Sequence, residues 1–108
     1  MNLLDLKQKL EKGQSLGGDV VYVKEENLIC GIGSVYKNKD GKSITLLKSK
    51  EESVKVDNFI GILDDLYESV GNGEVFVGND SYIREEDQII KSVEFAQYEM
   101  IKMLFINV

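Results

Sequence analysis

The residues that carry most enzymatic chemistry are scarce in this chain of 108 residues. It contains no histidine, no tryptophan, no proline and a single cysteine. Histidine is the commonest acid–base catalyst at neutral pH, and serine or cysteine nucleophiles usually depend on it for activation. Cys30 lies in an apolar run between Ile29 and Ile32, so we interpret it as buried packing material. The pattern predicts no catalytic residues.

Metal and nucleotide sites have equally little support in the sequence. Zinc usually takes several Cys or His ligands, and the chain has one cysteine and no histidine. The best calcium-loop spacing places Tyr36 and Leu47 where the two anchoring acids belong. The glycines of Gly31-Ile32-Gly33 fall inside a strand-like run, whereas a dinucleotide loop joins a strand to a helix. We therefore predict no metal ion and no cofactor.

Charge is the one chemically distinctive property of the sequence. The net charge is −6, which argues against a protein that binds nucleic acid directly through its phosphates. Residues 1–54 hold nine lysines against eight acids, a balance of +1, whereas residues 55–108 hold four basic residues against eleven acids, a balance of −7. An asymmetry of this kind bears on partners more than on fold. Solubility alone is the plainer explanation of an acidic surface.

If the acids of the second half share a surface, they would attract a cationic protein and speed its encounter. Two tyrosines lie among them, and tyrosine is a favoured interface residue. The resulting predicted partner-binding set is Asp57, Asp64, Asp65, Tyr67, Glu68, Glu74, Asp80, Tyr82, Glu85, Glu86 and Asp87.

The elements that must position these residues begin with a central meander. Residues 17–50 predict three antiparallel strands, since apolar residues alternate and two turn sequences separate them. Gly41 suits the left-handed position of one turn, and Asn27 that of the other. Gly31 and Gly33 predict a trough in the middle strand, where either a helix packs closely or the strand bulges.

Helical spacing predicts the remaining elements. Asn2 is placed to cap a short helix that ends at Gly13, and Asp57 to cap a second helix that runs to Val70. A short strand follows at residues 74–78, and a third helix is expected from Ser81 to about Leu104. Residues 92–108 are also rich in strand formers, so their last part, residues 100–108, is alternatively an edge strand.

The expected fold class is therefore α+β. It consists of a three-stranded antiparallel meander plus a fourth short strand, packed by about three helices in the order α-β-β-β-α-β-α, as one domain over residues 1–108. No apolar run approaches the length that spans a bilayer. The charged, leucine-rich N-terminus does not resemble a signal peptide, and one cysteine suits a reducing compartment, so we expect a cytoplasmic protein that does not bind membranes.

Two functional classes follow from these observations. The first is a small acidic protein that neutralises a basic partner, such as a bacterial or phage immunity protein or an inhibitor of a nuclease toxin or nucleic-acid-binding protein. The alternative is a structural or assembly module, such as a phage or accessory-complex subunit, that pairs through a sheet edge. An enzyme whose only catalytic groups are carboxylates is the least favoured hypothesis, because acid–base catalysis rarely occurs without histidine or a metal ion.

Overall fold

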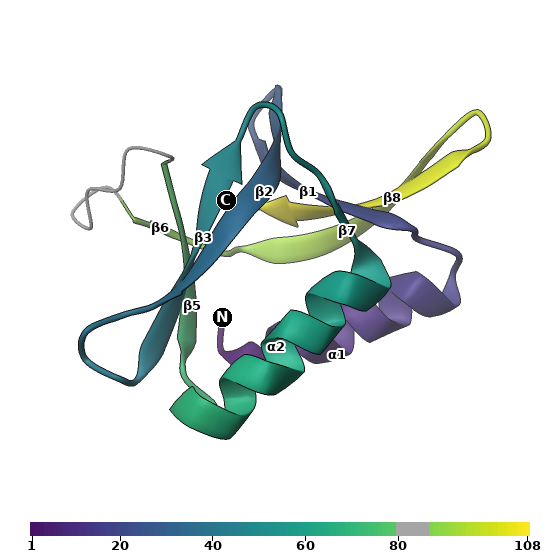
Figure 1. Ribbon diagram of the computed structural model, residues 1–108. Helices are drawn as coiled ribbons and strands as arrows, with labels where there is room; N and C mark the ends of the chain where they lie inside the picture. The colour runs from purple at the N-terminus through teal and green to yellow at the C-terminus, as the bar shows by residue number, and fades with distance from the viewer. Residues whose placement is uncertain (80–86) are drawn as a thin grey trace.

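The computed structural model describes residues 1–79 and 87–108, and within them two helices lie side by side against one face of a curled, eight-stranded sheet (Figure 1). The strands therefore outnumber the helices, and the architecture has two layers. Along the chain the elements are α1 (Leu3–Ser15), β1 (Val20–Glu25), β2 (Leu28–Lys37), β3 (Ser43–Ser49), β4 (Val54–Lys55), α2 (Val56–Val70), β5 (Glu74–Gly78), β6 (Gln88–Ile89), β7 (Ser92–Tyr98) and β8 (Ile101–Asn107).

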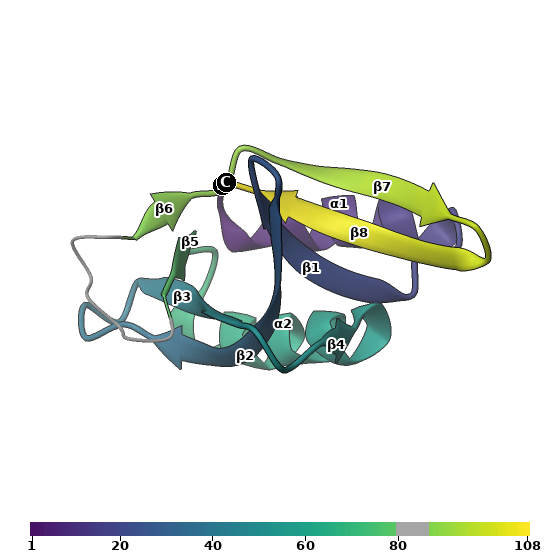
Figure 2. The same cartoon turned by 90° about the horizontal axis from the view of Figure 1, so that it is seen from above.

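The curl of the sheet follows from its strand order, which is β6-β5-β3-β2-β1-β8-β7, with β4 also paired to β1. Its two edge strands, β6 and β7, are consecutive in the chain and are separated only by Ile90 and Lys91. A sheet whose opposite edges belong to one short segment has to bend round until those edges approach each other. Figure 2 shows this bend from above, with β7 and β8 crossing over α1.

The topology repeats itself. Each half of the chain is a helix followed by strands that pair in antiparallel succession: α1 with β1, β2 and β3, then α2 with β5, the β6–β7 segment and β8. Two parallel pairings join the halves, β3 with β5 and β1 with β8. In both pairings the first strand of one half lies beside the last strand of the other. The helices α1 and α2 therefore occupy equivalent places in the two halves.

The core lies between the helix pair and the inner face of the sheet. Strand residues alternate between the two faces, so Ile44 and Leu46 of β3 point to the helices while Thr45 points to the opposite face. Both helices contribute one apolar stripe each. The side chains that are completely buried and largest are Leu3, Leu6, Leu10, Ile44, Leu46, Phe59, Leu63, Leu104 and Ile106.

The fold class expected from the sequence is wrong. The meander β1–β2–β3 is present, but it is part of a mixed sheet of eight strands, and the expected order α-β-β-β-α-β-α with three helices does not describe the chain. The described part of the expected third helix consists instead of β6, β7 and β8. Within residues 100–108 the strand β8 covers Ile101–Asn107, but it is not an edge strand, because it pairs with β1 on one side and with β7 on the other.

The third helix was mispredicted because its apolar residues have a spacing compatible with a helix and with a buried strand. Leu104 and Ile106 face the helices, while Phe105 on the other face is covered by Tyr22, with ring centroids 6.3 Å apart. A strand buried on both faces gives a continuous apolar run, which periodicity alone does not distinguish from a helix. Pairing with β1, about eighty residues earlier, decides the matter.

The predictions that concern single turns and one irregularity of β2 were partly correct. Gly41 has the expected positive φ of 69°, whereas the other turn places Glu26, with φ of 54°, in the left-handed region in place of Asn27. The trough in β2 is a bulge, with a register shift between Ile32 and Ser34. A Cβ on Gly31 would lie 1.4 Å from the backbone oxygen of Glu52, so the chain after β3 passes directly over this glycine.

Candidate functional site: the exposed face of α2

One face of the helix α2 packs into the core. Val56, Phe59 and Leu63 recur at helical spacing and are buried. The opposite face is exposed over the whole helix and carries acidic residues at the same spacing. We call this set the α2 acidic stripe; its members are Asp57, Asp64, Asp65 and Glu68.

The start of α2 differs from the prediction. The N-cap residue is Lys55, in extended conformation and without a side-chain capping bond, so Asp57 is not the cap. Asp57 lies in the first helical turn, where its carboxylate accepts a hydrogen bond from the backbone N–H of Asn58 at 2.9 Å. A negative charge is favourable at this end of a helix because the first N–H groups point toward it. The end of the helix is as predicted, at Val70 before Gly71.

Only one carboxylate of the stripe has an ionic partner among the described residues. The ammonium nitrogen Nζ of Lys7 in α1 lies 2.5 Å from Oδ1 of Asp64. This contact joins the two helices, and the spacing of residues within α2 does not reveal it. The hydrogen bond from Lys7 to this carboxylate raises the pKa of the lysine. Within residues 1–79 and 87–108, no cationic nitrogen lies within 4.0 Å of Asp57, Asp65 or Glu68. Three exposed carboxylates therefore face solvent together.

Gly61 lies in the middle of the stripe and has no evident role in the fold. It occupies the interior of α2, and a Cβ built on it meets nothing within 4 Å. A glycine in the interior of a helix lowers stability by about 0.5–1 kcal/mol relative to alanine. Its place between Asp57 and the pair Asp64 and Asp65 leaves the helix backbone exposed there. The sequence contained this signal, a glycine inside a predicted helix, but the prediction did not use it.

Apolar side chains border the stripe on both sides. Ile62 and Tyr67 are each 39% exposed, and the 3.6-residue period places them on opposite sides of the acidic residues. Ile62 lines a small depression together with Val35 and Glu52. Tyr67, a member of the predicted set, therefore does lie beside the acids of α2. Together these residues form a surface with a charged centre and apolar margins.

The two other predicted site residues that the structure describes, Glu74 and Asp87, do not join this surface. Glu74, at the start of β5, forms an ion pair with the N-terminal amino group of Met1. Asp87 accepts a hydrogen bond at 3.1 Å from the hydroxyl of Thr45, which points away from the helices. Four further predicted residues, Asp80, Tyr82, Glu85 and Glu86, lie outside the described residues.

A second polar group joins three strands at the far end of the sheet. Glu25 accepts hydrogen bonds from Gln88 at 2.7 Å and from Lys48 at 3.3 Å. These two bonds, that from Gln88 first, lower the pKa of the Glu25 carboxyl. Lys48 also donates a hydrogen bond to the side-chain oxygen of Gln88 at 3.2 Å, so the cluster connects β1, β3 and β6.

Within the described part of the chain, no group of three or more His, Cys, Asp or Glu side chains is arranged to hold a metal ion. Cys30 is a free cysteine of intermediate exposure, so it is not fully buried as the sequence suggested. No described helix is long and apolar enough to cross a bilayer.

The sheet edges relevant to an assembly role are also different from those expected. Both outer strands of the meander are paired, β1 with β8 and β3 with β5, and residues 101–107 are flanked on both sides. Among the described strands, β6 and β7 end the order, so β7 is the longer edge. The hairpin tip beyond it exposes Tyr98 (72%), Met100 (94%) and Ile101 (57%).

Comparison of the chain with protein-family models, with curated proteins and with solved structures gave no match in any of the three.

Proposed function

We propose that this protein is a small cytoplasmic binding protein that neutralises a basic protein partner and has no catalytic activity of its own. The classes that fit are an immunity protein of a bacterial or phage system and an inhibitor of a nuclease toxin or nucleic-acid-binding protein. The observation that supports this most is the α2 acidic stripe, where three exposed carboxylates have no cationic neighbour among the described residues. Neither nucleic acid nor a membrane is a direct partner in this proposal.

The chemistry of such a partner follows from that of the stripe. Proteins that bind nucleic acid keep a positive cleft for phosphates, and the exposed carboxylates of α2 present negative charge that such a cleft attracts. Complementary potentials of this kind raise the association rate and select against acidic competitors. Gly61 adds a place where a bulky side chain of the partner can reach the helix backbone, and Ile62 and Tyr67 supply apolar contact at the margins.

The test is capture from extract of the native cell with immobilised protein. We expect the wild-type chain to retain one or more basic proteins, with an association rate that falls steeply as salt rises. The triple variant Asp57→Asn, Asp65→Asn, Glu68→Gln should lose this capture while keeping its fold by circular dichroism. All three side chains are exposed, so the substitutions leave the core intact.

A matched control separates a specific surface from net charge alone. The variant Glu11→Gln, Glu51→Gln, Glu99→Gln removes the same charge from exposed positions outside α2 and should capture the partner normally. Equal loss in both variants would mean that net charge, and no particular face, attracts the partner. Unchanged capture by the α2 variant would contradict the proposal.

The exposed β7–β8 hairpin favours a second candidate, an assembly module that pairs through the β7 edge. The unpaired backbone groups of an edge strand are able to extend a sheet with a strand of another chain. In that case the protein should self-associate or join a scaffold in a manner insensitive to salt. The variant Met100→Lys should then abolish the assembly, which sedimentation velocity measures, and should leave capture through α2 unchanged.

A further inference from the structure

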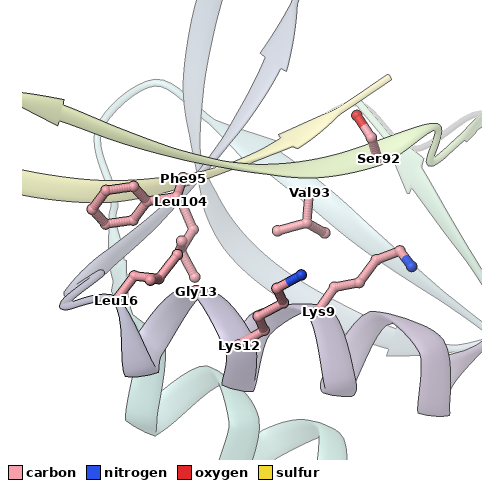
Figure 3. A pocket seen from close by; sticks show the side chains of 8 residues that line it. All are labelled: Lys9, Lys12, Gly13, Leu16, Ser92, Val93, Phe95 and Leu104. Atoms are coloured by element: carbon pink, nitrogen blue, oxygen red, sulfur yellow. The ribbon is translucent and has the colours of Figure 1, made fainter.

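A pocket of about 330 Å³ opens between the C-terminal half of α1 and the edge strand β7 (Figure 3). It is separate from the α2 acidic stripe, because none of its lining residues belongs to α2. The residues that line it are Lys9, Lys12, Gly13, Leu16, Ser92, Val93, Phe95 and Leu104.

The floor of the pocket is apolar and firmly supported. Leu104 of β8 is completely buried, and a Cβ built on Gly13 would approach its side chain to 2.3 Å, so α1 and β8 are in tight contact there. Next to this contact, Val93 and Phe95 of β7 are only partly buried. The space above them is the part of the helix–sheet interface that the chain does not fill with its own side chains.

The rim of the pocket is cationic. The side chains of Lys9 and Lys12 rise from α1 toward the strands, with their ammonium groups at the mouth of the pocket (Figure 3). Among the residues that the structure describes, no carboxylate lies within 4.0 Å of either ammonium group. Like charges one turn apart on a helix repel each other.

From this combination we propose that the pocket binds a medium-chain amphiphilic carboxylate as a free monomer. The alkyl chain lies on Val93, Phe95 and Leu104, and the carboxylate is bound by the ammonium groups of Lys9 and Lys12. The ligand relieves two unfavourable features at once: it fills apolar space, and it neutralises the repulsion between the lysines. The hydroxyl of Ser92 accepts a hydrogen bond from the side chain of Asn107 at 3.0 Å, and its own O–H is able to donate a further hydrogen bond to the carboxylate.

The pocket volume sets the size of the ligand. Small-molecule sites span about 300–1,000 Å³, so this pocket is near the lower limit. Because liquid water occupies about 30 Å³ per molecule and a methylene group is of similar size, a chain of roughly eight to ten carbon atoms fills the space. An acidic peptide would engage the lysines but would leave most of the apolar floor in contact with water.

The experiment is isothermal titration calorimetry with sodium decanoate below its micelle concentration, with decanol at equal concentration as the uncharged comparison. We expect saturable binding of one decanoate per chain and much weaker binding of decanol. The variant K9M/K12M keeps the length of both side chains and should weaken decanoate binding about tenfold or more, because it removes both charged hydrogen-bond donors to the carboxylate. The control K39M/K42M removes two exposed lysines from the β2–β3 turn and should bind normally.

A second variant tests the apolar part of the site. Val93→Phe extends a side chain into the pocket and should abolish binding of decanoate while the lysines remain. Backbone NMR shifts on titration should concentrate at Gly13, Val93 and Phe95. The proposal is overturned if decanoate does not saturate, if K9M/K12M binds as tightly as wild type, or if decanol binds equally well. Binding of an acidic peptide in preference to decanoate would also overturn it. None of these outcomes affects the proposal for α2.

Discussion

The helices α1 and α2 occupy equivalent places in the two halves of the chain, yet they differ in what they leave exposed. α1 has mixed charge, is capped by the side chain of Asn2, and at Gly13 lies directly against the sheet. α2 has no side-chain cap, carries only acids among its charged residues, and has open space at Gly61. Two helices in equivalent places therefore share a buried apolar stripe but differ in the charge and the packing of their remaining faces.

The largest expected effect is a loss of unfolding free energy when a buried leucine of either helix is replaced, because both helices contribute to one core. Leu6 of α1 and Leu63 of α2 are both completely buried. Replacing either by alanine removes apolar contacts and leaves a cavity, so each variant should lose about 2–5 kcal/mol of unfolding free energy. Urea denaturation measures this loss. If one variant lost far less than the other, that helix would not be part of the common core, and the equivalence of the two halves would fail.

The two helix glycines should respond to the same substitution with opposite signs. At Gly13 an added methyl group overlaps the buried Leu104 side chain, and overpacking of this kind costs about 1–3 kcal/mol. At Gly61 the methyl group meets nothing, so Gly61→Ala should stabilise the chain by about 0.5–1 kcal/mol. Thermal unfolding of both variants provides the measurement.

The same pair of glycines also sharpens the functional contrast. If the exposed backbone at Gly61 receives a partner side chain, Gly61→Ala should weaken partner capture although it stabilises the fold. A stabilised variant with unchanged capture would restrict the docking surface to the carboxylates.

A smaller effect is expected at the helix starts. The side chain of Asn2 accepts a hydrogen bond from the backbone N–H of Asp5 at 2.9 Å, and loss of such a cap in Asn2→Ala should cost about 0.5–2 kcal/mol. Lys55 has extended geometry suitable for a cap but forms no side-chain bond, so Lys55→Asn should gain up to about 1 kcal/mol. Chemical denaturation of both variants tests the contrast; equal responses would show that the caps do not distinguish the helices.

The smallest effect concerns the contact between the helices. The pKa of Lys7 is raised by its hydrogen bond to Asp64. A raised folded-state pKa means that the contribution to stability is complete below the unfolded-state pKa and is lost as pH rises through the folded-state value. Both side chains are exposed enough for solvent to screen the pair, so the stability change should be slight. An NMR titration should show the Lys7 pKa falling in Asp64→Asn; an unchanged pKa would disprove the contact.

Sequence reasoning succeeded where the signal was local. The cap at Asn2 is as expected, although α1 continues past Gly13 to Ser15. The end of α2 and the positive φ of Gly41 were also correct. Each of these features depends on residues within one or two turns of one another, so neighbouring residue types are sufficient to predict them.

The same reasoning failed where long-range contacts decide. In β7 and β8, apolar residues suited to a helix are held as strands by the pairing of β8 with β1. Of the predicted site, the structure brings together Asp57, Asp64, Asp65, Tyr67 and Glu68, which share one helix and hence one local period. Glu74 and Asp87 were grouped with them only by nearness in sequence, and the sheet directs them elsewhere.

The sequence by itself determined the start of α1, the end of α2, the meander and the excess of acid in the second half, because these depend on residue types and short spacings. Only the tertiary structure decided that residues 88–107 contribute the strands β6, β7 and β8, that Lys7 pairs with Asp64, and that two lysines border an apolar pocket. The reason is physical: such features arise between segments far apart in the chain, and no single segment contains the free energy of a contact it makes with another.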